Sequence, residues 1–364
     1  MMTPTSKKVS WTTLSNDKIF HRHSFACGVY KDRYILMAGQ TAAMYDVVTR
    51  AHIPLPDLPF VVTCGVVFDD FFYVANPRER MHRISLSRRK NWEPIGKERE
   101  LIGSMVTDGN HIYFISLIDL TIEIRRYDPS KDKVTSMRNY FFIHSGFATV
   151  VIDRKIYIIG GIAGVNVFDI VTRTWGHAPP LPKQLSFANA VAFDKWIVVT
   201  GGKTVVRGYY VRENDIAFIF DTHTQRWTTN NVVSTPCRLG NCCVRVGSQI
   251  ISVGGWNKEF KYCPIEAIQI KYLLPDWSWE TIKPYVMLRA LVDENRAAPS
   301  TQVAKKKHAF VAFNILWRIV FGKKRPTQTI TTDEELKQNI LIQKSFTDLP
   351  LDVFRNIISF MIGP

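Results

Sequence analysis

The chain has 364 residues, of which 46% are hydrophobic and 12% aromatic, and its formal net charge is +15 at pH 7. This composition supplies enough apolar surface for a large core and allows more than one domain. Six cysteines without a Cys-x-x-Cys pair argue against a disulfide framework and for a reducing compartment. The first thirty residues contain no apolar run. We therefore expect no signal peptide and a cytoplasmic protein.

From Phe25 onward, one pattern occurs six times: an apolar strand, a tight turn and a second apolar strand. The turn positions, 38 to 53 residues apart, are Asp32, Asp70, Asp108, Asp153, Asp194 and Gly247. A repeat of this length with several strands in each unit predicts a β-propeller.

Each unit continues into a third and a fourth strand with a signature of its own. An aromatic residue and an aspartate end the third strand at Tyr45-Asp46, Tyr127-Asp128, Phe168-Asp169 and Phe220-Asp221. Tryptophan opens the fourth strand at Trp92, Trp175, Trp227 and Trp279. Gly-Gly doublets close the second strand at Gly160-Gly161, Gly201-Gly202 and Gly254-Gly255. This pattern resembles the Kelch repeat over residues 10–283, and the resemblance implies an all-β, six-bladed Kelch propeller.

The residues of the repeat have structural roles. Glycine accepts positive φ where the second strand breaks, the aspartate caps a turn, and the aromatic residues pack between blades. Closure of the ring has two candidate segments. Trp11–Leu14 reads as a fourth strand without the preceding three, and Trp279–Ile282 could fill the same place.

Loops between the second and third strands, and those entering the next blade, emerge on one face of a propeller and are free to bind a partner. The longest such loop is expected at Lys203–Asp215, followed by one at Trp256–Tyr262. Tyr, Trp and Arg often anchor interfaces, which makes candidates of Arg207, Tyr209, Tyr210 and Trp256. The alternative is a solvated loop without a partner.

In Kelch proteins that bind peptides, residues just before the innermost strand surround the central opening. By that resemblance, the target-binding candidates here are Arg22, His144 and Arg238, with Glu100, Phe60 and Leu185 beside them. The arginines suit an acidic segment, whereas Glu100 does not.

Catalytic chemistry has little support in the sequence. His21 and His23 could share one face of a strand, but two ligands do not complete a metal shell. There is no phosphate loop and no nucleophile motif. We therefore expect no enzyme, no cofactor and no metal, and a metal-dependent propeller enzyme is the least favoured alternative.

The composition changes near Lys283, and residues 284–344 are expected to form a small α-helical region. Its basic stretch at 305–325 holds seven Lys or Arg residues and no acid. The apolar run His308–Phe321 is too short to span a bilayer, so we favour a packed helix over contact with a membrane surface. The basic clusters also match a weak nuclear signal. Nucleic acid is not expected as a partner, because no binding motif accompanies the charge.

Residues 345–364 form the third predicted part, an apolar helix that begins with a capping Asp348. The order Leu-Pro-x-Asp-Val-x-x-x-Ile-Ile-x-x-Met resembles the opening of an F-box, as in the truncated F-box of poxvirus ankyrin-repeat proteins. The resemblance implies binding to a Skp-type adaptor and its cullin through Leu349, Pro350, Val353, Ile357, Ile358 and Met361. We therefore predict a substrate receptor of a cullin–RING ubiquitin ligase, with a protein target. The alternative is a Kelch scaffold on cytoskeleton or membrane.

Overall fold

The computed structural model describes residues 11–16, 25–39, 41–76, 79–96, 102–118, 121–141, 146–161, 164–206, 209–230, 241–255 and 263–274. The chain divides into the units Met1–Pro275 and Asp276–Pro364. The predicted helical region at 284–344 and the F-box-like helix at 345–364 lie outside the described residues. Within the described part, no helix is long and apolar enough to cross a bilayer.

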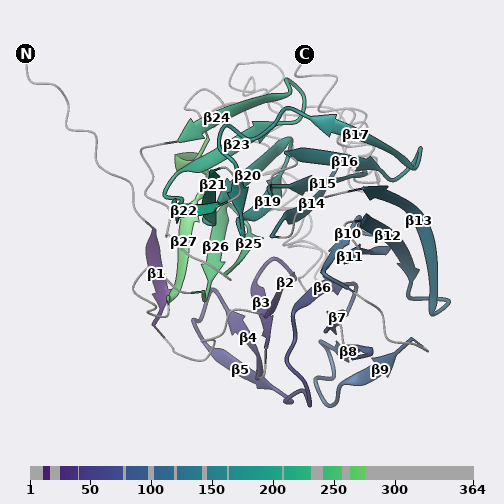
Figure 1. The fold of residues 1–364 in the computed structure, drawn as a ribbon. Coiled ribbons are helices and arrows are strands. Elements are labelled where there is room, and N and C mark those ends of the chain that lie inside the picture. The colour runs from purple at the N-terminus through teal and green to yellow at the C-terminus, as the bar shows by residue number, and fades with distance from the viewer. Residues whose placement is uncertain are drawn as a thin grey trace, which may run out of the picture. The chain divides into compact units, whose positions relative to one another are not determined.

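The first unit is an all-β propeller of six four-stranded blades, which follow one another round a common centre (Figure 1). Blade 1 consists of β2 (Ala26–Tyr30), β3 (Tyr34–Ala38), β4 (Ala42–Asp46) and β5 (His52–Leu55). Blade 2 consists of β6 (Cys64–Phe68), β7 (Phe71–Ala75), β8 (Met81–Ser85) and β9 (Glu93–Ile95). Blade 3 consists of β10 (Ser104–Thr107), β11 (Ile112–Ile118), β12 (Thr121–Asp128) and β13 (Lys133–Phe141).

The second half of the ring contains the departures from a simple repeat. Blade 4 is regular, with β14 (Ala148–Ile152), β15 (Lys155–Ile159), β16 (Val165–Asp169) and β17 (Thr174–Ala178). Blade 5 consists of β19 (Asn189–Phe193), β20 (Trp196–Thr200), β23 (Ala217–Asp221) and β24 (Arg226–Asn230). Blade 6 combines β25 (Cys242–Val246), β26 (Gln249–Val253) and β27 (Ile265–Gln269) with β1 (Thr12–Ser15) from the start of the chain. A short 3-10 turn, η1 (Ile270–Tyr272), follows β27.

The ring closes through the N-terminal strand. In the register of β1 and β27, Thr12 lies opposite Ala267 and Thr13 opposite Glu266. This confirms the interpretation of Trp11–Leu14 as a fourth strand without the preceding three. The competing segment at 279–282 lies outside the described residues.

The turns follow the repeat chemistry that the sequence predicts. Between β14 and β15, Asp153 and Arg154 have φ values of 49° and 57°, the left-handed conformation that a two-residue hairpin turn requires. After the third strand of blade 4, Oδ1 of Asp169 accepts backbone N–H groups from Val171 and Thr172, both at 2.9 Å. Equivalent turns are capped by Asp46, Asp128 and Asp221.

The core lies between neighbouring blades. Tyr157 of blade 4 and Phe220 of blade 5 have ring centroids 6.2 Å apart within one buried cluster. Phe220 is fully buried, and a side chain of this size contributes about 2–3 kcal/mol when it leaves water. Because each such cluster takes residues from two blades, a blade is stabilised by both of its neighbours.

The repeat tryptophans connect blades by a hydrogen bond as well as by packing. Trp227 stacks on Phe220 of its own blade at 4.8 Å, and its indole N–H donates to the carbonyl of Pro179 in the preceding connection at 2.7 Å. Trp92 makes the same bond to the carbonyl of Pro56, also at 2.7 Å. The proline-bearing loop of the motif therefore supplies the acceptor.

Candidate functional site

We call the linker face the side of the propeller that carries the connections between second and third strands and the linkers between blades. Its largest described feature belongs to blade 5. The connection after β20 forms a hairpin of β21 (Lys203–Val206) and β22 (Tyr209–Glu213), which pairs with β18 (Leu185–Ser186). The prediction of a long loop at 203–215 is therefore wrong. Most of this segment forms two strands of a small three-stranded sheet, which is added to blade 5.

Glycines permit the close approach that anchors this small sheet. Gly160 has φ +101°, and a Cβ there would lie 2.7 Å from the carbonyl oxygen of Leu185. Gly202 has φ +81°, and a Cβ there would lie 2.7 Å from the carbonyl oxygen of Ser186. The amide of Gly161 donates to the carbonyl of Leu185 at 2.7 Å. Residues 185 and 186 are therefore held between two Gly-Gly doublets.

A buried asparagine fixes the other end of the hairpin. Asn214 is 2% exposed, and its Nδ2 donates to the carbonyls of Gly201 at 3.2 Å and Ile216 at 2.7 Å. Its backbone amide donates to the carbonyl of Gly202 at 2.9 Å. The hairpin is consequently attached to blade 5 at both ends.

Two apolar side chains on the linker face are exposed and were missed by sequence reasoning. Phe187 is 44% exposed and Val61 is 37% exposed. Phe187 also has φ +59°, an unfavourable conformation for a bulky residue, and its amide donates to the carbonyl of Gly146 at 2.6 Å. Strain of this kind collects at functional sites. The sequence signal was weak, because Phe187 precedes a strand like many core residues.

The structure places few of the predicted target-binding residues. The candidates outside the described residues are Arg22, Glu100, His144, Arg207, Arg238 and Trp256. The backbone of Tyr209 and Tyr210 lies in β22, opposite Val206 and Val205. Leu185 is fully buried and is removed from the list of surface candidates. Phe60 is half-buried against His82, with centroids 4.9 Å apart.

The innermost strands carry a polar network between blades 5 and 6. Nδ2 of Asn189 donates to Oδ1 of Asn241 at 2.7 Å, and Nδ2 of Asn241 donates to Oγ of Ser252 at 2.9 Å. Asn241 and Ser252 are buried, so these bonds satisfy groups that cannot reach water. The network joins blades rather than presenting a site.

The predicted packing of cysteines in inner strands is confirmed for the four at Cys27, Cys64, Cys242 and Cys243. Burial raises the pKa of Cys27, and it raises the pKa of Cys64 to about 12. Both side chains are therefore neutral thiols at physiological pH and pack as small apolar groups.

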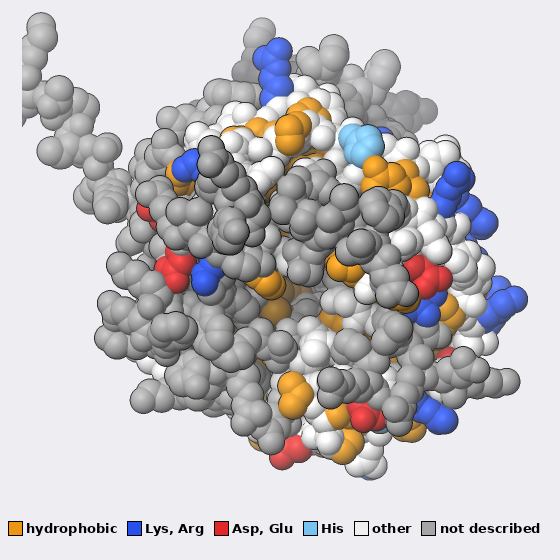
Figure 2. Space-filling view, in the orientation of Figure 1, with side chains coloured by type: hydrophobic (Ala, Val, Ile, Leu, Met, Phe, Trp, Pro, Cys, Tyr) orange, Lys and Arg blue, Asp and Glu red, His pale blue; other side chains and the backbone are white. Residues whose placement is uncertain are grey.

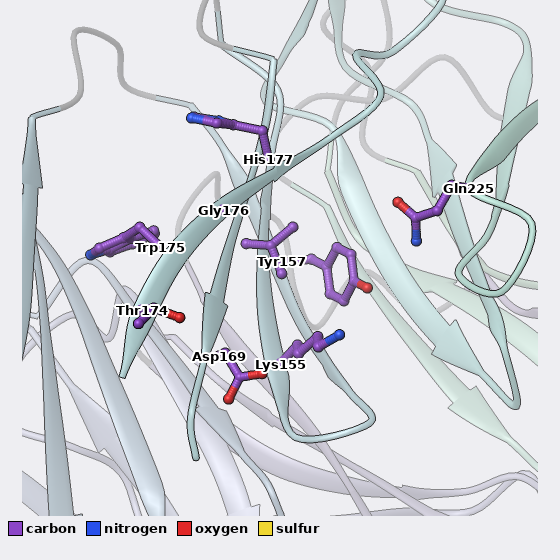
Figure 3. A pocket seen from close by; sticks show the side chains of 9 residues that line it. Lys155, Tyr157, Asp169, Thr174, Trp175, Gly176, His177 and Gln225 are labelled. Atoms are coloured by element: carbon purple, nitrogen blue, oxygen red, sulfur yellow. The ribbon is translucent and has the colours of Figure 1, made fainter. Parts of the chain in front are cut away.

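A groove of about 310 Å³ lies between blades 4 and 5 (Figure 3). Its lining residues are Lys155, Tyr157, Val167, Asp169, Thr174, Trp175, Gly176, His177 and Gln225. Asp169 is engaged in capping its turn, and burial raises the pKa of Tyr157 to about 12. Among the described residues, no group of three or more His, Cys, Asp or Glu side chains is arranged to hold a metal. The groove is a gap beside Gly176, where a Cβ would meet nothing within 4 Å.

Comparison with known proteins points to one class. Residues 144–182 match the Kelch motif. The chain is similar to beta-scruin of Limulus polyphemus (22% identity over 39% of this chain and 17% of that protein) and to Kelch-like protein terF of Aspergillus terreus (28%, over 35% and 31%). It is also similar to an F-box/kelch-repeat protein of Arabidopsis thaliana (30%, over 28% and 24%). The chain thus spans less than a third of the length of each.

The described part of the chain is thus an all-β, six-bladed propeller that contains a Kelch motif and is similar in sequence to proteins with Kelch repeats. The match falls on the end of the linker before blade 4, on blade 4 itself and on the proline-bearing linker after it. Blade 4 holds the most typical copy of the repeat, with Gly160-Gly161, Phe168-Asp169 and Trp175 in their expected places.

Proposed function

We propose that this chain is a protein-interaction module and, more specifically, a substrate receptor for a cullin–RING ubiquitin ligase. The propeller would hold a target protein while the F-box-like helix at 345–364 docks on a Skp-type adaptor. The observation that carries the binding role is the linker face of blade 5, where a hairpin is fixed to the ring and Phe187 lies exposed beside it.

The shape of this face suits a protein target better than a small molecule. Loops and added hairpins on a rigid scaffold are common binding elements. Exposed aromatic side chains are frequent anchors of interfaces, and Phe187 stands in the linker that the Gly-Gly doublets hold in place. Figure 2 shows hydrophobic side chains within the hollow near the middle of the view. A peptide segment or loop of a partner would fit such a surface.

The ligase role has support from the sequence and from one relative. The order Leu349-Pro350, Val353, Ile357-Ile358 and Met361 gives an apolar stripe of the kind that docks in a groove. The Arabidopsis relative is named as a protein that combines an F-box with Kelch repeats. A chain with a propeller and an F-box-like helix would connect a target with a ligase.

The adaptor interaction is tested with the purified full chain and a purified Skp-type adaptor by isothermal titration calorimetry. We expect Pro350→Ala and Ile357→Asp to abolish binding, because both residues belong to the apolar stripe. Asn356→Ala is the matched control, since Asn356 belongs to the same predicted helix but not to the apolar stripe of its sequence pattern. Binding that survives Ile357→Asp would refute the adaptor role and leave an interaction scaffold.

A further inference from the structure

The face opposite the linker face carries an unexpected surface. Because the strands of each blade alternate in direction, the turns between first and second strands and those after third strands all lie at the same end of the blades. We call this end the turn face. Its turns in the described part of the chain number eleven, two in each of blades 1 to 5 and one, between β25 and β26, in blade 6. They surround the common centre.

Apolar side chains stand at the tips of two of these turns. Val48 is 71% exposed and Val171 is 59% exposed, the two highest values among the large hydrophobic residues described as exposed. They occupy the same position in two nearly identical turns, Asp-Val-Val-Thr-Arg and Asp-Ile-Val-Thr-Arg.

Each apolar tip has a cation beside it. Arg50 follows Val48 by two residues and Arg173 follows Val171 by two residues, and both cations are exposed. Asp46 is paired with Arg33 through bonds of 2.9 and 2.5 Å, so its charge is balanced by a cation other than Arg50. Asp169 keeps its charge while Oδ1 accepts backbone N–H groups of its own turn.

The excess of positive charge extends round the ring. The exposed cations of the turns are Lys31, Arg50, Arg88, Arg89, Lys90, Lys131, Arg154 and Arg173. The exposed carboxylates of the same turns are Asp32, Asp69, Asp132 and Asp153. Two of these four already accept hydrogen bonds, Asp32 from Gly247 and Asp132 from Tyr127.

We propose that the turn face binds the surface of an anionic lipid bilayer, with the tips of Val48 and Val171 entering the interface and the adjacent cations contacting headgroup phosphates. Turns from opposite sides of a ring can reach one plane together, which a bilayer offers. Apolar tips gain free energy by entering a bilayer interface. They gain nothing against a nucleic-acid backbone, which is the main alternative for a cationic surface.

The binding assay is co-sedimentation of the full chain with vesicles of phosphatidylcholine alone and with one third phosphatidylserine. We expect binding to the anionic vesicles only, and weaker binding at higher salt. The double variant Arg50→Glu/Arg173→Glu should bind more than about tenfold more weakly, because each basic residue near an anionic surface contributes about 1 kcal/mol. Val48→Ser/Val171→Ser should weaken binding about threefold to tenfold without a change of charge.

The control is Arg80→Glu/Val61→Ser, which reverses one charge and replaces one valine at exposed positions of the linker face. It should bind vesicles like the unchanged chain, and thermal unfolding should show that all variants are folded. Equal binding by the turn-face variants and the control would overturn the proposal and assign any binding to another part of the chain. Single-stranded RNA that binds as tightly, with no effect of Val48→Ser/Val171→Ser on either ligand, would show charge attraction alone and also overturn it.

Discussion

The backbone amide of Gly247 donates a hydrogen bond of 2.7 Å to Oδ1 of Asp32, although 215 residues separate them in the chain. Gly247 lies in the turn between β25 and β26 of blade 6, and Asp32 lies in the equivalent turn of blade 1. The bond therefore crosses the junction where the ring closes, the same junction that β1 closes by pairing with β27.

The closing bond predicts a specific loss of stability. Asp32→Ala should lower the free energy of unfolding by about 1–2 kcal/mol more than Asp153→Ala does. Both residues occupy left-handed turn positions, with φ of 48° and 49°. The free-energy cost of placing alanine in this backbone conformation should therefore be the same in both variants. Urea unfolding of the two variants measures the difference. Equal losses would show that the closing bond contributes nothing.

The Gly-Gly doublets give a second prediction. Gly160→Ala and Gly202→Ala should each destabilise the propeller by about 2–4 kcal/mol, since the added Cβ meets backbone at 2.7 Å and the φ values are positive. Gly176→Ala is the control, because its Cβ meets nothing within 4 Å and Gly176 lies within strand β17. It should be neutral or stabilising by up to about 1 kcal/mol. If Gly176→Ala destabilises the propeller as much as the other two substitutions do, close approach of the linker backbone to Gly160 and Gly202 is not the cause of their effect.

Two equivalent tryptophans should respond differently to the loss of their indole N–H. Trp227→Phe removes the bond to the carbonyl of Pro179, whereas Nε1 of Trp175 is buried with no hydrogen-bond partner in the described part of the chain. We expect Trp227→Phe to cost about 1 kcal/mol more in unfolding free energy than Trp175→Phe. A larger loss for Trp175→Phe would indicate that ring packing alone decides the outcome.

Acid should destabilise the propeller through its turn aspartates. The guanidinium of Arg33 beside Asp46 holds the pKa of that carboxyl well below its ordinary value, and backbone N–H groups, first that of Thr172, lower the pKa of Asp169. The folded state thus binds fewer protons than the unfolded chain, whose aspartates titrate near pH ~4. Stability is therefore present above that pH and is lost progressively as the pH falls below it.

The test of this pH dependence is thermal unfolding between pH 7 and pH 3 with Asp46→Asn beside the unchanged chain. The variant should be less stable at pH 7, and the difference in stability between the two chains should narrow as the pH falls. The reason is that Asp46 of the unfolded, unchanged chain takes up a proton near its ordinary pKa, whereas Asp46 of the folded chain stays ionised beside Arg33. A difference in stability that stays constant from pH 7 to pH 3 would show that the charge of Asp46 does not cause the loss of stability in acid.

Sequence alone located the repeats better than it located their additions. The six turn positions, from Asp32 to Gly247, were visible because each tight turn needs a residue that tolerates positive φ. The hairpin of β21 and β22 lies in a stretch that the repeat pattern marks only as a connection between second and third strands. Its local signal is the strand preference of Val205, Val206, Tyr209 and Tyr210.

Ring closure shows a second limit of prediction from the sequence. Trp11 and Trp279 both begin segments that match the fourth strand of the motif, so pattern alone could not choose between them. The pairing of Thr12 with Ala267 decides the matter for the N-terminal segment. Phe187 was likewise invisible, since only the path of the linker reveals that its side chain is exposed. The predicted adaptor-binding residues at 349–361 stay predictions.

We propose that the propeller recruits a target while the predicted helix at 345–364 recruits an adaptor. The most direct measurement is affinity purification from cells of the full chain beside a chain that ends at Lys344, read by mass spectrometry. We predict that the Skp-type adaptor and a cullin are recovered only with the full chain, and that the same target proteins are recovered with both. Absence of the adaptor and cullin from the full-chain sample would contradict the receptor role.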